Sequence, residues 1–326
     1  MSGLFVGADI GGTNVKVGLV DRHGSLVGAS QIDTRSDEGP ERVIERSLSL
    51  AGDLLSETGA SWRRVEGVGV ACAGLVRVST GVLVTAPNLP DWEDVPLAGI
   101  LGAATDVDAY LDNDVNAFAY AESRLGVARG RSHGVFLALG TGVGGGLLID
   151  GEVYRGRDGF AAELGHIVID PGGPLCECGN RGCLESLVRS KTIVEAATES
   201  YRKAGMEGEL LRIAGGDLSK LTPKMLSDAA SAGDASAIGV FRETGRWLGI
   251  AVGGLINVFN PEIVVIGGGV AQAGGPLLGP CRHWAGRYAF SASYASAPIV
   301  QASLGANAAM VGAALEARDR CGIPCG

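Results

Sequence analysis

The segment from Ala162 to Glu185 holds residue types suited to metal chemistry. His166 is followed by Cys176, Cys178 and Cys183, with glycines and prolines between them. Three thiolates and one imidazole can close a tetrahedral zinc site, and glycine lets the chain wrap around a metal. Because four protein ligands leave no open position for a catalytic water, we expect this zinc to be structural.

Three glycine-rich turns, each following an apolar run, form a second group. They contain Gly11, Gly12 and Thr13, Gly140, Thr141 and Gly142, and Gly267, Gly268 and Gly269. Such turns offer backbone N–H groups to phosphate oxygens, and a threonine hydroxyl adds a donor. One turn alone is more often a tight hairpin, but three in one chain favour a bound nucleotide. Neither a P-loop nor a Rossmann motif fits, because the Gly-Lys-Ser/Thr signature is missing and the second turn lies between two predicted strands.

Asp114 is the candidate for acid–base chemistry. Residues 106–111 predict a strand that runs into Asp112, Asn113 and Asp114, and 115–122 predict a helix. Such a strand-to-helix junction is where α/β proteins usually place their chemistry. From these residues alone, a helix cap is an equal interpretation of Asp114, and Asp112 competes for the role of base.

The predicted elements repeat along the chain. Strands at 4–9 and 15–20 flank the first glycine turn, and strands at 135–139 and 147–149 flank the second. This repetition indicates a duplicated α/β domain whose turns face one cleft. We expect a small lobe of residues 1–115 plus 305–326 and a large lobe of residues 116–304.

Two helices stand out between these strands. Residues 40–58 predict an amphipathic helix, and a longer helix extends from an Asp234 cap to about residue 259. In the longer helix Gly245, Gly249 and Gly253 repeat at one-turn spacing. We interpret this smooth stripe as a helix-packing surface in preference to a seat for a flat ligand.

Composition excludes several classes of protein. The net charge of the 326 residues is −9 and the chain has no long Lys/Arg run, which argues against a nucleic-acid partner. No apolar run is long enough to span a membrane, and an apolar strand begins at Leu4 without a basic leader, so we expect a cytoplasmic protein. Seven cysteines and no signal peptide favour metal over disulfides. Four of them are interpreted as ordinary thiols: Cys72, Cys281, Cys321 and Cys325.

Five motifs together resemble the ROK family of bacterial sugar kinases and repressors. They are Asp9-Ile-Gly-Gly-Thr-Asn14, Asn113-Asp-Val-Asn116, Leu139-Gly-Thr-Gly-Val-Gly-Gly145, Glu163-Leu-Gly-His166 and Cys176-Glu-Cys-Gly-Asn-Arg-Gly-Cys-Leu-Glu185. The motifs cover nearly the whole chain in order, and the cysteine segment is the most specific of them. The resemblance implies a two-lobed, actin-like fold of the hexokinase superfamily (ribonuclease H-like), with sugar and Mg-ATP meeting in the cleft.

The resemblance also implies a role for individual residues. Asp114 would accept the proton of the sugar hydroxyl that attacks the γ-phosphate, and Asp9 would hold Mg2+ directly or through water. The implied nucleotide-binding residues are Asp9, Gly11, Gly12, Thr13, Asn14, Gly140, Thr141, Gly142, Gly267, Gly268 and Gly269, with the last three near the adenosine. The implied sugar-binding residues are Gly74, Asn88, Asn113, Asp114, Glu163, His166 and Glu185. Zinc on His166, Cys176, Cys178 and Cys183 would hold His166, Glu163 and Glu185 as a rigid wall facing the sugar.

A few positions depart from the family pattern near the expected sugar pocket. Cys72-Ala73-Gly74 stands where Pro-Gly is common, Ala162 replaces a frequent glycine, and Val115 replaces alanine. These changes leave the kinase chemistry intact, but they bear on which sugar fits.

The sequence therefore predicts an ATP-dependent hexose kinase, and glucokinase in particular. Other acceptors within the family are N-acetylmannosamine, N-acetylglucosamine, mannose, allose and fructose, and polyphosphate is an alternative donor. The resemblance suggests a homo-oligomer, either a dimer or a dimer of dimers. A sugar-sensing transcriptional regulator is the rival of another class; it is less favoured because we expect such a protein to carry a DNA-binding helix-turn-helix ahead of the first strand. An actin-like filament protein does not explain the cysteine cluster.

Overall fold

The computed structural model describes residues 3–203 and 209–322, and the chain divides into two compact units. The first unit comprises Met1–Gly130, Glu152–Ala161 and Ala306–Gly326, and the second comprises Arg131–Gly151 and Ala162–Gly305. Cys325, expected to be an ordinary thiol, lies outside the described residues.

The first unit holds most of the strands that the structure describes and fewer of the helices. Its strands are β1 (Leu4–Ile10), β2 (Asn14–Asp21), β3 (Leu26–Asp33), β4 (Val65–Cys72), β5 (Leu75–Arg77), β6 (Val82–Thr85), β7 (Glu93–Val95), β8 (Ala109–Asn113) and β11 (Glu152–Val153). Its α-helices are α1 (Pro40–Glu57), α2 (Leu97–Thr105), α3 (Asp114–Arg124) and α11 (Ala308–Arg320).

The second unit is richer in helix. Its strands are β9 (Gly134–Leu139), β10 (Val143–Ile149), β12 (Ile263–Gly267) and β13 (Ile299–Gln301). Its α-helices are α4 (Leu184–Val188), α5 (Ser190–Lys203), α6 (Glu209–Ile213), α7 (Pro223–Ser231), α8 (Ala235–Phe259), α9 (Gly275–Tyr288) and α10 (Ser291–Ser296).

One strand-pairing pattern occurs in both units. In the first, the order is β3-β2-β1-β4-β8, and β1 pairs antiparallel with β2 and parallel with β4. In the second, four strands lie in the order β10-β9-β12-β13, and β9 pairs antiparallel with β10 and parallel with β12. The first glycine turn thus closes the β1–β2 hairpin and the second closes the β9–β10 hairpin. The two hairpins occupy corresponding places in their sheets. A separate sheet, β5-β6-β7, was not predicted from the sequence.

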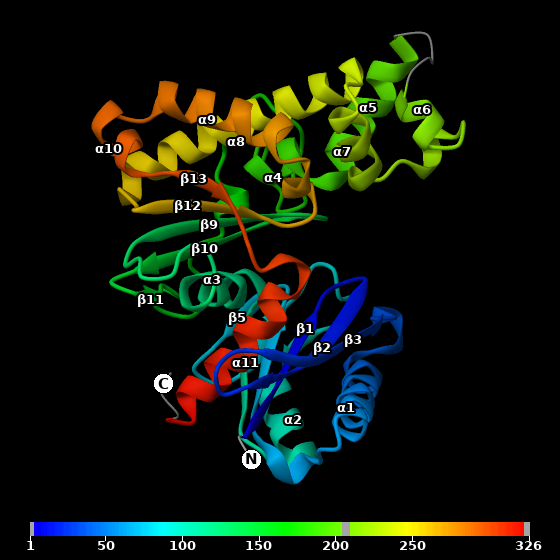
Figure 1. Cartoon of the computed structure of the whole chain (residues 1–326), viewed down its shortest axis with the longest axis vertical. Coiled ribbons are helices and arrows are strands. Elements are labelled where there is room, and N and C mark those ends of the chain that lie inside the picture. The colour runs from blue at the N-terminus through cyan, green and yellow to red at the C-terminus, as the bar shows by residue number, and fades with distance from the viewer. Residues whose placement is uncertain (1–2, 204–208, 323–326) are drawn as a thin grey trace. The chain divides into compact units, whose positions relative to one another are not determined.

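Glycines allow α11 to lie directly on the first sheet (Figure 1). Gly7 pairs with Gly18 on β2 and with Gly69 on β4, so three glycines stand side by side. A Cβ at Gly7 would lie 2.1 Å from the backbone oxygen of Met310, and one at Gly69 would lie 1.8 Å from that of Ala313. Any larger side chain would push the helix off the sheet. The alternate residues of these strands point to the opposite face, where they pack with α1 and α2.

The glycine stripe of α8 packs against α9, as the sequence predicted (Figure 1). A Cβ at Gly245 would lie 2.5 Å from the backbone oxygen of Leu277, and one at Gly249 would lie 2.5 Å from that of Cys281. The stripe therefore lets two helix backbones approach each other closely.

The division between the units differs from the boundary expected after residue 115. That boundary falls inside α3, and the structure keeps α3 in the first unit. The physical reason is close packing on α11, because a Cβ at Gly312 would lie 1.8 Å from the backbone oxygen of Ala117. The segment 152–161 also joins the first unit, although it was expected in the large lobe.

In the described part of the chain, no helix has both the length and the apolar character to cross a membrane.

Candidate active site

Three parallel strands of the first unit end at one edge of its sheet. β1, β4 and β8 are neighbours, and their register pairs Ile10 with Cys72 and Cys72 with Asn113. Burial raises the pKa of the Cys72 thiol well above its usual range, and the charges of Asp114 and Asp9 raise it further. The two carboxylates thus lie on either side of this thiol, at the sheet edge where α/β proteins bind ligands.

The corner between β8 and α3 is fixed by Asn113. Its Oδ1 accepts hydrogen bonds from the backbone N–H groups of Val115 (2.8 Å) and Asn116 (3.2 Å), and its Nδ2 donates to the backbone oxygen of Gly74 (3.1 Å). Asn113 is therefore the helix cap, and the interpretation of Asp114 as the cap is wrong. Asp114 occupies the first helical position, where its Oδ1 accepts from the Val115 N–H at 3.0 Å.

The carboxylate of Asp112 is buried and hydrogen-bonded to other protein groups. It is 1% exposed, and its Oδ2 accepts from Arg155 Nε at 2.5 Å. Its Oδ1 accepts from the Asn113 N–H at 2.7 Å and from Asn116 Nδ2 at 2.9 Å. Both oxygens of this rival base are thus engaged by protein groups.

The first glycine turn is held by a residue that the sequence did not single out. The Gly11 N–H donates to the Asn14 backbone oxygen at 3.1 Å and closes the turn. Thr34, fully buried, donates its hydroxyl to the Gly11 oxygen (2.6 Å) and its N–H to the Thr13 oxygen (2.8 Å). Thr34 follows β3, about twenty residues downstream, and no local pattern links it to the turn.

Asn88 and Asp9 lie beside this turn. A Cβ at Gly12 would lie 2.8 Å from the Cβ of Asn88, so the two residues are in contact. Burial raises the pKa of Asp9, while Lys16, whose Nζ is 3.6 Å from Asp9 Oδ2, lowers it. One carboxylate beside a phosphate-type turn suits Mg2+, which is usually held by one or two carboxylates together with substrate phosphates.

The other two glycine turns are neighbours in the second unit. β12 pairs with β9 so that Gly267 lies opposite Ala138. Gly268 has a φ of 85°, and a Cβ there would lie 2.2 Å from the backbone oxygen of Leu139. Only glycine fits this position, and the turn at 267–269 is thereby held against the strand that leads into 140–142.

Three predicted sugar-binding residues gather in the second unit. Glu185 Oε2 accepts from the Val143 N–H at 2.9 Å, and its Oε1 lies 3.7 Å from Cys176 Sγ. Partial desolvation raises the pKa of Glu163, the charge of His166 lowers it, and that of Glu185 raises it. Glu163, His166 and Glu185 thus form one polar group between a glycine turn and the cysteine cluster.

The cysteine cluster fits a zinc ion. The ligand atoms of His166, Cys176, Cys178 and Cys183 all lie within 4.8 Å of one another. Cys178 Sγ is 3.6 Å from Cys183 Sγ, and Cys176 Sγ is 3.7 Å from His166 Nδ1. Tetrahedral zinc with Zn–S bonds of about 2.3 Å spaces its ligands at roughly 3.5–3.8 Å, so these distances suit it. A hydrogen bond from the backbone of Asn180, with smaller effects of Cys183 and Cys176, lowers the pKa of Cys178 to about 7, which favours the thiolate.

The predicted site residues fall into two groups, one in each unit. The first unit holds Asp9, Gly11, Gly12, Thr13, Asn14, Gly74, Asn88, Asn113 and Asp114. The second unit holds Gly140, Thr141, Gly142, Glu163, His166, Cys176, Cys178, Cys183, Glu185, Gly267, Gly268 and Gly269.

A cavity of about 540 Å3 in the first unit lies away from the predicted site residues. It surrounds the start of β8 and part of α2, and its lining includes Asp106, Asp108, Tyr110 and Arg320. It contains none of the predicted site residues, and β8 runs from this cavity toward Asp114.

The strand pairing, the glycine turns and the metal-ligand cluster define a class of α/β protein, and comparison with known proteins gives its family. The model of the ROK family matches residues 5–320. The chain belongs to the ROK family.

Relatives within the family include kinases and repressors. Glucokinase of Thermotoga maritima is 38% identical over 318 residues, which cover 98% of each chain. A crystal structure of a ROK family glucokinase from Streptomyces griseus, in complex with glucose and AMPPNP, is 33% identical with a TM-score of 0.87, and the match covers 97% of this chain and 100% of that one. A xylose repressor of Caldicellulosiruptor bescii is 28% identical, over 95% of this chain and 77% of the repressor.

Proposed function

We propose that this protein is an ATP-dependent hexose kinase, and specifically a glucokinase that converts D-glucose and ATP to glucose 6-phosphate and ADP. The observation that carries the proposal is Asp114 at the carboxyl end of β8, within a chain that matches glucokinases along nearly its whole length. The glucose and AMPPNP bound to the Streptomyces griseus enzyme support a hexose and an ATP-type nucleotide as ligands.

In the proposed reaction, Asp114 accepts the proton of the attacking sugar hydroxyl, and the γ-phosphoryl group passes to that oxygen as ADP leaves. Phosphoryl transfer depends on positioning and on neutralising charge, so one ionised carboxylate and fixed donors suffice. Asp9 is the residue that would hold Mg2+, which neutralises phosphate charge when bound. The turns at 11–14 and 140–142 contact the phosphates, and 267–269 lies near the adenosine.

On this proposal the two units are the lobes of an actin-like fold. Gly74, Asn88, Asn113, Glu163, His166 and Glu185 bind the sugar hydroxyls together with Asp114. His166, Cys176, Cys178 and Cys183 would hold a structural zinc, which would fix the imidazole of His166 and so order the glutamates beside it. A homo-oligomeric state, dimer or dimer of dimers, remains a prediction.

The test is ADP release from Mg-ATP with glucose, mannose, fructose, allose and the N-acetylhexosamines, with polyphosphate as a second donor. The proposal predicts the highest kcat/KM with glucose and ATP. A preference for another sugar would revise the acceptor, whereas no turnover with any sugar or donor would reject the kinase. The repressor relatives then make sugar binding without catalysis the second candidate, which calorimetry with the same sugars would detect.

A further inference from the structure

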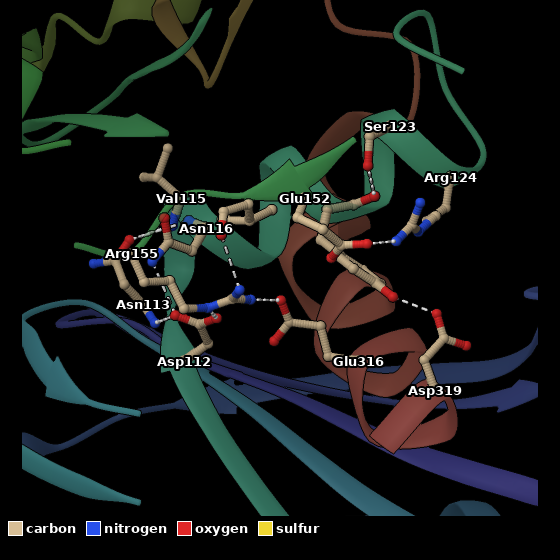
Figure 2. Close-up of polar contacts among 12 residues, drawn as sticks. Asp112, Asn113, Val115, Asn116, Ser123, Arg124, Glu152, Arg155, Glu316 and Asp319 are labelled. Atoms are coloured by element: carbon tan, nitrogen blue, oxygen red, sulfur yellow. Dashed lines mark hydrogen bonds and ion pairs between the residues drawn. The ribbon is translucent and has the colours of Figure 1, made fainter. Parts of the chain in front are cut away.

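A buried ion cluster includes Asp112, the residue that precedes Asn113 at the corner between β8 and α3 (Figure 2). Arg155 Nε donates to Asp112 Oδ2 at 2.5 Å, and Nη2 of the same guanidinium donates to Glu316 Oε1. Asp112 is 1% exposed and Glu316 is 5% exposed. One side chain thus joins three segments that are far apart in the sequence: β8, the segment 152–161 and α11.

The two buried carboxylates depend on Arg155 for charge balance. Burial raises the pKa of Glu316 well above its usual range, and Asp112 raises it further, whereas Arg155 and Arg320 lower it. A buried charge that loses its partner is strongly unfavourable. Without the guanidinium, Asp112 Oδ2 and Glu316 Oε1 would each lose a hydrogen-bond donor in a buried environment, and we expect Asp112 to shift.

Asp112 in turn holds the corner. Its Oδ1 accepts from the Asn113 N–H at 2.7 Å and from Asn116 Nδ2 at 2.9 Å. Asn116 Oδ1 is buried and has no hydrogen-bond partner among the described residues. The orientation of this amide therefore rests on its bond to Asp112, and Asn113, the cap of α3, is anchored to the same oxygen.

We propose that Arg155 is a positioning residue for phosphoryl transfer. By fixing Asp112 against Glu316, it sets where the β8–α3 corner presents Asn113 and Asp114. The inference rests on the proposed function, because it assigns the purpose of the ion cluster to a reaction at Asp114. Misplacing a reacting group by about 1 Å can cost about 100-fold in rate, so an anchor one residue behind this corner matters. Arginine suits the task because its planar fork bonds two carboxylates in different directions, which the single charge of lysine cannot reproduce.

Arg124, on the helix α3 that Asp114 begins, offers a matched control for Arg155. It lies on α3 and pairs with Glu152 of the segment 152–161 at 3.4 Å (Figure 2). Its guanidinium stacks over the Tyr120 ring at 4.7 Å. Arg124→Met removes a partly exposed ion pair of this region and leaves the bonds of Asp112 in place. Arg155→Met removes the anchor itself.

The kinetic test compares these variants at saturating glucose and ATP. We expect Arg155→Met to lower kcat by roughly 10- to 100-fold and to change the KM for ATP by less than about threefold, because the displaced groups act on the sugar side of the reaction. Arg124→Met should keep both constants within about twofold.

A second readout does not depend on activity. Hydrogen exchange of the Asn113, Val115 and Asn116 amides should be faster in Arg155→Met than in the wild type, and unchanged in Arg124→Met. If Arg155→Met does not fold, Arg155→Lys, which keeps the positive charge, is measured in its place, with the same direction of change in kcat and exchange expected.

Wild-type kcat in the folded Arg155 variant would overturn the inference. A loss of kcat with exchange raised uniformly along the chain, or matched by Arg124→Met, would also overturn it in favour of a general role in stability. A wild-type protein without turnover would reject the proposed function, and exchange at the three corner amides would still show whether Arg155 positions the corner.

Discussion

At the scale of single residues, Asp112 and Asp114 show how environment separates two identical side chains. Asp112 is buried and bonded to Arg155, Asn113 and Asn116, so it acts as part of the scaffold. Asp114 is the first residue of α3, at the end of the parallel strand β8. Its charge and that of Asp9 both raise the pKa of the Cys72 thiol. The strand-to-helix position could be predicted from the sequence, but the partner of Asp112 could not, because Arg155 is 43 residues away.

The metal cluster gives a prediction for one cysteine. Cys178→Ser should lower the zinc content of the purified protein and raise the KM for glucose by about 10-fold, because on our proposal a zinc bound there would orient His166 and the adjacent Glu163 and Glu185. Zinc is measured by atomic emission and KM by ADP release. Cys321→Ser, at the end of α11 and outside the cluster, is the control and should retain the metal. Unchanged zinc and KM in Cys178→Ser would refute the assigned role of this cluster.

At the scale of elements, the glycines of α8 affect stability in opposite directions, depending on which face of the helix they occupy. Gly249 faces α9, where a Cβ would lie 2.5 Å from the Cys281 backbone oxygen, while nothing lies within 4 Å of a Cβ at Gly254. Gly249→Ala should therefore lower the free energy of unfolding by about 1–3 kcal/mol through overpacking. Gly254→Ala should raise it by up to about 1 kcal/mol through helix propensity. Urea denaturation measures both, and equal effects of the two substitutions would contradict the packing account.

The cap of α8 makes a pH-dependent contribution. Burial acts to raise the pKa of Asp234, but hydrogen bonds from the Tyr201 hydroxyl and from backbone N–H groups, including that of Ala237, outweigh it and lower the pKa. A carboxyl with a lowered folded pKa adds stability above its unfolded value, near 4, and loses it as the pH falls through the folded value.

Asp234→Ala should therefore cost about 1–2 kcal/mol of unfolding free energy at pH 7 and less below about pH 4. Asp234→Asn is the control, because asparagine also caps helices but carries no charge. It should retain much of the stability and lose the pH dependence. A deficit of Asp234→Ala that stayed constant down to pH 3 would contradict a charged cap.

The elements that depend on residues close together in the sequence are the ones that could be predicted from it. The hairpins at the first two glycine turns, α1 and α8 follow from periodicity and capping residues, which lie within a few residues of one another. The β5-β6-β7 sheet has strands of three or four residues, too short to show alternation. The place of α3 in the first unit depends on contact with α11, about 190 residues further along the chain, and no local signal encodes it.

At the scale of the molecule, each unit carries part of the predicted constellation on the same strand framework. Asp9, the first glycine turn, Asn88 and Asp114 belong to the first unit, and the other two turns and the metal cluster belong to the second. On the proposed function, the reaction between a sugar and a nucleotide would use both groups. The family match from residue 5 to residue 320 spans both units, which is why the proposal treats them as one enzyme.

The most direct test of the account is the steady-state rate of ADP release from Mg-ATP with glucose, compared between the wild type and Asp114→Asn. Removing a general base costs about 100- to 10,000-fold, so we expect a kcat loss in that range with zinc content and glucose binding retained. Asp106→Asn, at a left-handed position outside the predicted site that asparagine also tolerates, is the control and should match the wild type. Wild-type kcat in Asp114→Asn would contradict the assignment of the base, and with it the central claim about this site.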